Sequence, residues 1–184
     1  MKLHPYCSAA ICGVSACEKI RQEQLLPHGY GWADIAEVTF HFPPNADTAL
    51  RYRVPQSGQE GRFSMEFVGW QMLALGQIDD DLFKEPSVPA AFLEASEAGI
   101  FKRVYDLPAV AKDVRVIKVT VRLQDGTIYN YTEDRPLGSP VAPFTPDILG
   151  TKLENATYLA FSKAFLKSVV NWPDGTMADV LELL

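Results

Sequence analysis

Apolar and polar residues alternate over the segment 35–42, which predicts a strand with one buried face. Val38 and Phe40 fall on one side of an extended chain, and Thr39 and His41 fall on the other. This alternation is typical of a sheet that packs on a core with one face only. The segment therefore predicts the first strand of a half-buried sheet.

Further along the chain, the segment 114–123 alternates in the same way and is followed by a second strand over 127–131. Asp125-Gly126 between them is a strong hairpin-turn signal. The segment 50–54 also alternates and predicts a short strand or an extended segment. The segment 101–105 predicts a strand or the end of a preceding helix.

Helical spacing of apolar residues predicts a first helix over residues 8–24 and a second one that begins after Ser64. Ser64 suits the N-cap position, and Glu66 places a negative charge in the first turn, where the helix dipole favours it. Gly76 suits the position after the last turn. Because apolar residues run most of the way round this second helix, we expect it to be buried, with its N-terminus exposed next to the polar loop 55–60.

Capping residues and helix-breaking residues predict three more helices. One is expected over 86–98, with Gly99 after its end. Another is expected over 146–169 because Thr145-Pro146 combines an N-cap with the residue best suited to the first helical position. The last is a short helix over 177–184.

These elements predict an α+β fold, a two-layer sandwich of a mainly antiparallel sheet with helices on one face, followed by C-terminal helices. The boundary between the two parts falls after the proline-rich connection 135–143. We expect an α+β domain over 1–144 and a helical extension over 145–184 that packs on this domain or on a partner.

The composition is that of an ordinary globular chain: 184 residues, 47% hydrophobic and 22% charged, with a net charge of −6. The absence of a basic run argues against nucleic acid, and no apolar run is long enough to span a membrane. The N-terminus does not read as a signal peptide, so we expect a cytoplasmic protein.

The three cysteines, Cys7, Cys12 and Cys17, are spaced five residues apart, which on a helix turns each away from the last. They therefore cannot share one metal, and core packing is the favoured interpretation of Cys12 and Cys17. The acidic run 79–81 is interpreted as a solvated turn rather than a metal site. We expect neither a metal nor a cofactor.

Three segments resemble the MmgE/PrpD family, which includes 2-methylcitrate dehydratase, cis-aconitate decarboxylase and iminodisuccinate epimerase. The run from Pro55 to Phe67 is similar to the family's "P-x-T-G-x-E-[AG]-K-F-S-M-E-Y". The segments 2–7 and 135–152 are similar to its "K-x-Y-P-C-C" and "G-x-P-x-N-P-[LF]-[ST]-x-x-[ED]-[LI]-x-x-K". The resemblance covers nearly all of this chain but only the C-terminal part of the longer family chains.

The resemblance implies metal-independent lyase or isomerase activity on small polycarboxylates, which bind through cations and lose a proton to a general base. The family's N-terminal helical domain supplies an Asp and His residues to the active site, and we expect this part to be absent here. The implied catalytic residues are Lys2 and His4. The implied substrate-binding residues are Cys7, Arg62, Ser64 and Phe67.

Several positions depart from the family's pattern. Cys7 and Ile11 stand where relatives carry a catalytic or orienting His, Phe67 stands where a Tyr is common, and Arg62 replaces a Lys. Neither Cys7 nor Ile11 replaces a His as a base at neutral pH. We therefore expect no turnover by this chain alone.

Two alternatives remain beside an enzyme domain that acts on a di- or tricarboxylate. The first is a non-catalytic module of the same family that binds a carboxylate or another subunit. The second owes nothing to the family and is a generic α+β binding module whose ligand lies at the start of the Ser64 helix.

The many apolar residues in the expected C-terminal helices also predict association. The segments 146–169 and 177–184 carry more of them than one narrow stripe needs. We expect a homodimer or larger assembly through these helices, or a helical-domain partner chain.

Overall fold

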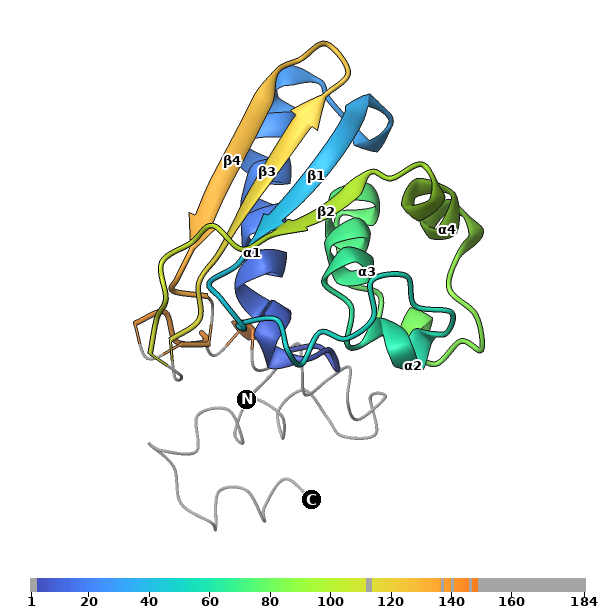
Figure 1. Ribbon diagram of the computed structural model, residues 1–184. Helices are drawn as coiled ribbons and strands as arrows, with labels where there is room; N and C mark the ends of the chain where they lie inside the picture. Colours follow the sequence, from blue (N-terminus) through green and yellow to red (C-terminus); the bar gives the residue numbers. More distant parts are fainter. Residues whose placement is uncertain (1–2, 112–113, 137, 140, 146, 149–184) are drawn as a thin grey trace. The chain divides into compact units, whose positions relative to one another are not determined.

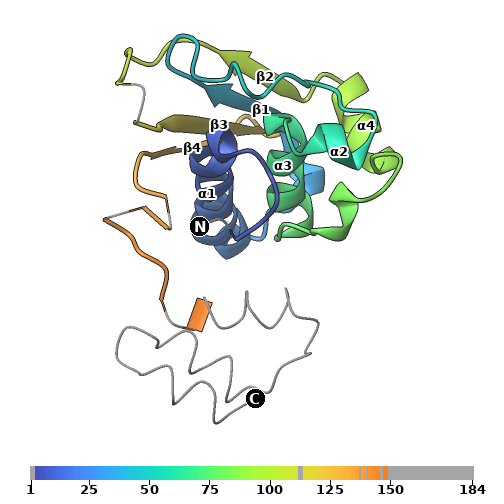
Figure 2. The same cartoon turned by 90° about the horizontal axis from the view of Figure 1, so that it is seen from below.

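The computed structural model describes residues 3–111, 114–136, 138, 139, 141–145, 147 and 148. It contains a four-stranded sheet with helices on one face, which confirms the expected α+β class (Figures 1 and 2). The chain divides into two compact units, residues 2–136 and residues 137–184 with residue 1. All four strands belong to the unit 2–136.

The order of the strands in the sheet is β2-β1-β3-β4. Their bounds are Ile35–His41 for β1, Phe101–Val104 for β2, Ile117–Leu123 for β3 and Ile128–Glu133 for β4. The pairs β1–β3 and β3–β4 are antiparallel, and Phe40 lies opposite Val119, so the two alternating segments share one sheet as predicted. The pair β1–β2 is parallel, which makes the sheet mixed.

The hairpin between β3 and β4 follows from its turn residues. Gly126 has φ +88°, a left-handed conformation that glycine adopts without a steric penalty. The Asp125 carboxylate accepts a hydrogen bond from the Thr127 amide at 2.8 Å, which stabilises the turn from inside. The predicted Asp-Gly hairpin is therefore confirmed.

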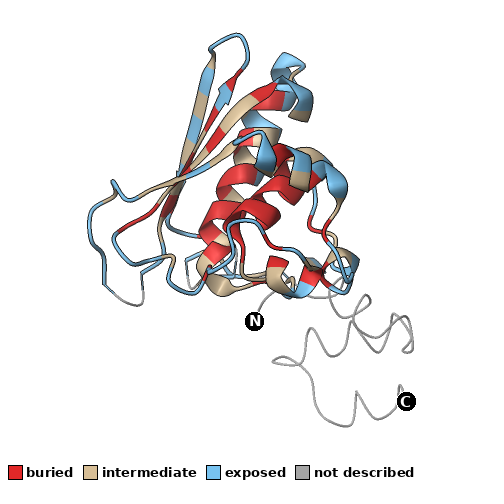
Figure 3. Ribbon diagram, turned by 45° about the vertical axis from the view of Figure 1, so that its right-hand side comes forward, coloured by how far each residue is buried: buried red, intermediate tan, exposed pale blue. Residues whose placement is uncertain are grey.

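Two long helical segments cover one face of the sheet. The first consists of a 3-10 turn Ser8–Ala10, α1 (Ile11–Lys19) and a π-helical turn Ile20–Leu25. The second consists of α3 (Met65–Trp70) and a π-helical turn Gln71–Leu75. Figure 3 shows that both are largely buried, which confirms the two helices expected over 8–24 and after Ser64.

Glycines set how closely α1 and α3 approach their neighbours. A Cβ atom on Gly13 would lie 2.5 Å from Met65 Sδ, so α1 passes close to α3 at this point. A Cβ atom on Gly69 would lie 2.6 Å from the Phe40 ring, so α3 lies directly on β1. Both contacts would be lost with any larger residue, because well-packed cores have no spare volume.

The two short helices differ from expectation. α2 (Gly58–Gly61) forms where only a polar loop was predicted, and α4 (Ala90–Glu97) begins four residues later than predicted from Pro86. The chain before α4 is extended because the Val88 amide donates to the Gln56 carbonyl at 3.2 Å. Pro89 then occupies the N-cap of α4.

The strand considered for 50–54 does not form. The carbonyls of Leu50 and Tyr52 accept hydrogen bonds from the Arg103 guanidinium at 2.8 and 3.5 Å. The Tyr52 amide donates to the Phe63 carbonyl at 3.2 Å. Because these backbone groups already have partners, they do not enter a ladder.

The C-terminal expectations fall mostly outside the described residues. Thr145 is the predicted N-cap, since its Oγ1 accepts from the Ile148 amide at 3.4 Å. The remaining parts of the helices expected over 146–169 and 177–184 lie outside the described residues. No helix in the described part of the chain is long and apolar enough to cross a membrane.

Candidate functional site

The N-terminal segment and the Ser64 segment meet in space. The Cys7 amide donates a hydrogen bond to the Arg62 carbonyl at 2.8 Å, which joins two of the three segments that resemble the MmgE/PrpD family. The side chains of Cys7 and Arg62 are both half-buried. Sequence reasoning assigned both residues to one site, and the structure brings them together.

His4 lies in the same N-terminal segment and contacts a carboxylate. Its Nδ1 lies 2.9 Å from Asp80 Oδ1, and its ring stacks on Tyr6 with a centroid separation of 6.2 Å. A carboxylate only accepts hydrogen bonds, so Nδ1 carries the proton and Nε2 is the basic nitrogen of the neutral ring. Lys2, the other predicted catalytic residue, lies outside the described residues.

The Arg62 guanidinium makes a hydrogen bond through only one of its nitrogens among the described residues. One Nη2 donor lies 3.5 Å from the Phe83 carbonyl, and Nε is buried without a hydrogen-bond partner among the described residues. A buried guanidinium N–H without a partner costs free energy. The guanidinium therefore retains donors for an additional acceptor such as a carboxylate.

The start of α3 is not open to solvent, and this part of the expectation is wrong. Ser64 is fully buried, and Met65, Glu66 and Phe67 are buried with it. Ser64 Oγ is a true N-cap, because it accepts from the Phe67 amide at 3.1 Å, and it also contacts Glu66 Oε2 at 3.3 Å. The hydroxyl already has protein partners, and the buried first turn is closed to an anion from solvent.

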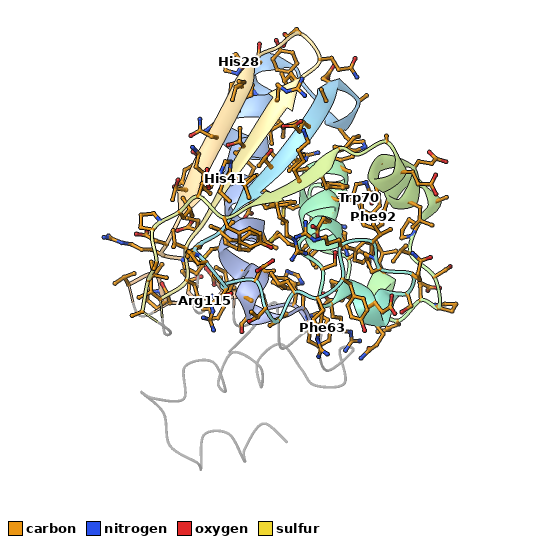
Figure 4. All side chains as sticks on the ribbon, viewed as in Figure 1. His28, His41, Phe63, Trp70, Phe92 and Arg115 are labelled. Carbon is orange, nitrogen blue, oxygen red and sulfur yellow. The ribbon has the colours of Figure 1, made fainter. Side chains whose placement is uncertain are left out.

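Phe67 is the centre of an aromatic cluster between α3 and α4. Its ring stands edge-on to Phe92 at 5.1 Å and to Phe83 at 6.0 Å, and it stacks on Trp70 at 6.0 Å. Trp70 and Phe92 lie side by side in Figure 4, with ring centroids 5.8 Å apart. Phe67 is fully buried, so the ring packs in the core rather than facing solvent.

Sequence reasoning missed a buried ionic cluster beside this site. The Arg103 side chain on β2 is 2% exposed and donates to Glu66 Oε1 at 2.7 Å and to Asp47 Oδ2 at 2.9 Å. Tyr105 donates its hydroxyl proton to the same Asp47 oxygen at 2.8 Å. The only sequence signal was Glu66 in an apolar helix, which indicates a buried charge in need of a partner.

The remaining candidate ligands do not form a metal site. In the described residues, no group of three or more His, Cys, Asp or Glu side chains is arranged to hold a metal ion. Cys12 and Cys17 are fully buried, as predicted. Burial raises the pKa of the Cys12 thiol to about 12 and raises that of Cys17 further, so neither forms a thiolate at neutral pH.

Comparison with known proteins adds no family. No protein-family model matches this chain, and no curated protein matches it. The MmgE/PrpD resemblance therefore rests on the sequence segments named above.

Proposed function

We propose that this chain is a C-terminal-type domain of an MmgE/PrpD-like lyase or isomerase that acts on small polycarboxylates. The observation that carries the proposal is the hydrogen bond from Cys7 N to Arg62 O at 2.8 Å. It joins two separate family-like segments, as a substrate site shared between them requires. We also propose that the domain works in the cytoplasm.

The roles of the residues follow from the chemistry of the substrate. Arg62 binds one carboxylate through its remaining donors, and Lys2 anchors a second one. His4, oriented by Asp80 through Nδ1, takes a proton next to a carboxylate with Nε2. Turnover also needs the groups that the family's helical domain supplies, so these residues are inactive by themselves and work together with such a domain or in a homodimer.

One observation favours a second function, a non-catalytic carboxylate-binding or subunit-interaction module of the same origin. Phe67 has no hydroxyl and is fully buried in the aromatic cluster, where relatives often carry Tyr. Cys7 replaces a His that the family uses near the substrate. A module of this kind keeps the Arg62 contact and binds carboxylates without converting them.

Calorimetry with citrate and cis-aconitate tests the binding common to both functions. We expect weak binding that falls with added salt, because the contact is largely ionic. Arg62→Ala should abolish the heat, and Arg51→Ala should leave it unchanged, since Arg51 is exposed and carries the same charge nearby in sequence. Equal binding by the Arg62→Ala variant would reject the site.

A turnover assay separates the two functions. The purified chain should not convert 2-methylcitrate, cis-aconitate or iminodisuccinate alone. Conversion that appears on adding an MmgE/PrpD-type helical domain, and that His4→Gln removes while His28→Gln does not, supports the enzyme domain. Carboxylate binding with no conversion under any pairing supports the non-catalytic module.

A further inference from the structure

A Thr-His-Asp series of contacts crosses the sheet on the face opposite α1. His41 at the end of β1 places Nδ1 2.9 Å from both carboxylate oxygens of Asp106. Its Nε2 lies 3.0 Å from Thr120 Oγ1 on β3 (Figure 4 labels His41). None of these three residues belongs to the carboxylate site proposed above.

The direction of each hydrogen bond follows from the chemistry of the groups. The Asp106 carboxylate only accepts, so His41 Nδ1 carries the ring proton. In the neutral imidazole Nε2 is then the acceptor, and the Thr120 hydroxyl must donate its proton to it. A hydroxyl that donates to an imidazole oriented by a carboxylate is the arrangement of an activated oxygen nucleophile.

The backbone holds this geometry in place. His41 lies opposite Val104 of β2 and Lys118 of β3 in the register of the sheet. Asp106 lies two residues after the end of β2. On either side of it, Phe42 N donates to Val104 O at 2.9 Å and Leu107 N donates to Phe42 O at 3.3 Å. The segment 105–111 passes over this end of the sheet on the face opposite α1 (Figures 1 and 2). Only 13% of the His41 side chain is exposed, so its ring has few alternative orientations.

We propose that Thr120, His41 and Asp106 form an acyl-transfer site that accepts the acyl group of activated esters of small carboxylic acids. Thr120 Oγ1 attacks the carbonyl carbon while its proton moves to His41 Nε2. The bond from carbon to the leaving oxygen breaks, and this oxygen keeps the electron pair and takes the proton from Nε2 to depart as an alcohol or phenol. Water then attacks the acyl carbon and gives one proton to Nε2. The acyl–Oγ1 bond breaks, the carboxylic acid departs, and the proton on Nε2 passes to Thr120 Oγ1.

Lys118 supplies a positive charge beside this site. It lies two residues before Thr120 on the same face of β3 and directly opposite His41. Its charge also contributes to lowering the pKa of the Asp106 carboxyl. An ammonium group at this place stabilises the negative charge that develops on the carbonyl oxygen during attack. The same charge attracts an anionic acyl part, so the site favours esters of anionic acids.

The test is acetylation of the full chain by p-nitrophenyl acetate near pH 8. We expect release of at most one equivalent of nitrophenolate in a rapid phase, with the acetyl group located on Thr120 by peptide mapping. His41→Gln should slow acetylation of Thr120 by about 10²–10⁴-fold, the usual contribution of a general base. Asp106→Asn should also slow it, because the amide can donate to Nδ1 and so favour the wrong tautomer.

Matched controls separate this site from general surface acylation. Thr39→Val removes the hydroxyl that lies opposite Thr120 on β1 and contacts Glu37 instead of His41, and it should change nothing. His28→Gln should also leave the rate unchanged, whereas Thr120→Val should abolish the rapid phase.

Two results would overturn the proposal: acetyl groups found on other side chains with none on Thr120, or equal labelling of Thr120 in wild type and in His41→Gln. If His41→Gln proves unfolded by circular dichroism, Asp106→Asn decides instead. The Asp106 side chain is 59% exposed, so this substitution leaves the core intact. Labelling of Thr120 that Asp106→Asn leaves unchanged then rejects the triad.

Discussion

Arg103 and Glu66 form a two-point ion pair inside the protein, with Arg103 Nε bonded to Glu66 Oε1 and Nη2 bonded to Glu66 Oε2. The two side chains are 2% and 4% exposed. The pair links β2 to the first turn of α3, and Asp47 adds the loop after β1 to the same guanidinium. One cation thus joins three parts of the chain that are distant in sequence.

Arg103→Met should lower the free energy of unfolding by about 3–5 kcal/mol, because it leaves the Glu66 and Asp47 carboxylates buried without their cation. Urea denaturation followed by circular dichroism measures this loss. The matched variant is Arg122→Met, whose side chain is 44% exposed and pairs with Glu37 at 3.2 Å. This substitution should lower the free energy of unfolding by less than about 1 kcal/mol. A similar loss for both variants would contradict the assignment of Arg103 to a buried ion pair.

Gly58→Ala should destabilise the protein by about 1–3 kcal/mol, the typical cost of overpacking. A Cβ atom at Gly58 would lie 2.1 Å from the Leu82 carbonyl oxygen, and backbone atoms cannot rotate away as a side chain can. Gly31→Ala is the control, since no atom lies within 4 Å of its Cβ position and its φ is −129°. Equal thermal midpoints for the two variants would contradict the close approach.

Iodoacetamide should not modify Cys12 or Cys17 in the native protein at pH 8. Burial raises the pKa of both thiols, and the reagent reacts with the thiolate. Peptide mapping of native and urea-unfolded samples checks this, because unfolding should make all three cysteines reactive. Rapid native labelling of Cys17 would show that the α1 face is not packed as described.

Acid should weaken the contact between Asp106 and His41. The hydrogen bond from His41 holds the pKa of the Asp106 carboxyl below its usual range in the folded protein. A lowered folded pKa contributes stability above the unfolded pKa, and the contribution is lost as the pH falls through the folded value. The stability difference between wild type and Asp106→Asn should therefore shrink below about pH 4. A stability difference between the two proteins that grows as the pH falls would contradict this prediction.

Local chemistry made part of this structure predictable. The alternation around Phe40 and Val119 fixed two strands, and Asp125-Gly126 fixed the hairpin, because these signals act over a few residues. Ser64 and Gly76 marked the ends of a helical segment for the same reason, and Gly76 has φ +80°.

The features that the sequence did not reveal depend on contacts between distant residues. The parallel pairing of β2 with β1 has no local signature, and Glu66 gave no sign of which cation would reach it. The alternation over 50–54 does not produce a strand, because Arg103 binds a carbonyl that a strand would use. In the candidate site, the contact between Cys7 and Arg62 agrees with the resemblance, which assigned both residues to one site. Outside that site, no sequence signal pointed to the contacts of His41 with Asp106 and Thr120, because the three residues come from separate parts of the chain.

The position of β1 inside the sheet has a consequence for synthesis of the protein. The ribosome makes β1 first, its parallel partner β2 second and its antiparallel partner β3 third. Until Val119 has left the ribosome, Phe40 lacks the strand that should lie beside it. Loop closure over such a separation slows folding and leaves an apolar strand edge open to other chains. Nascent chains that stall before β3 should therefore depend on chaperones more than the finished protein does.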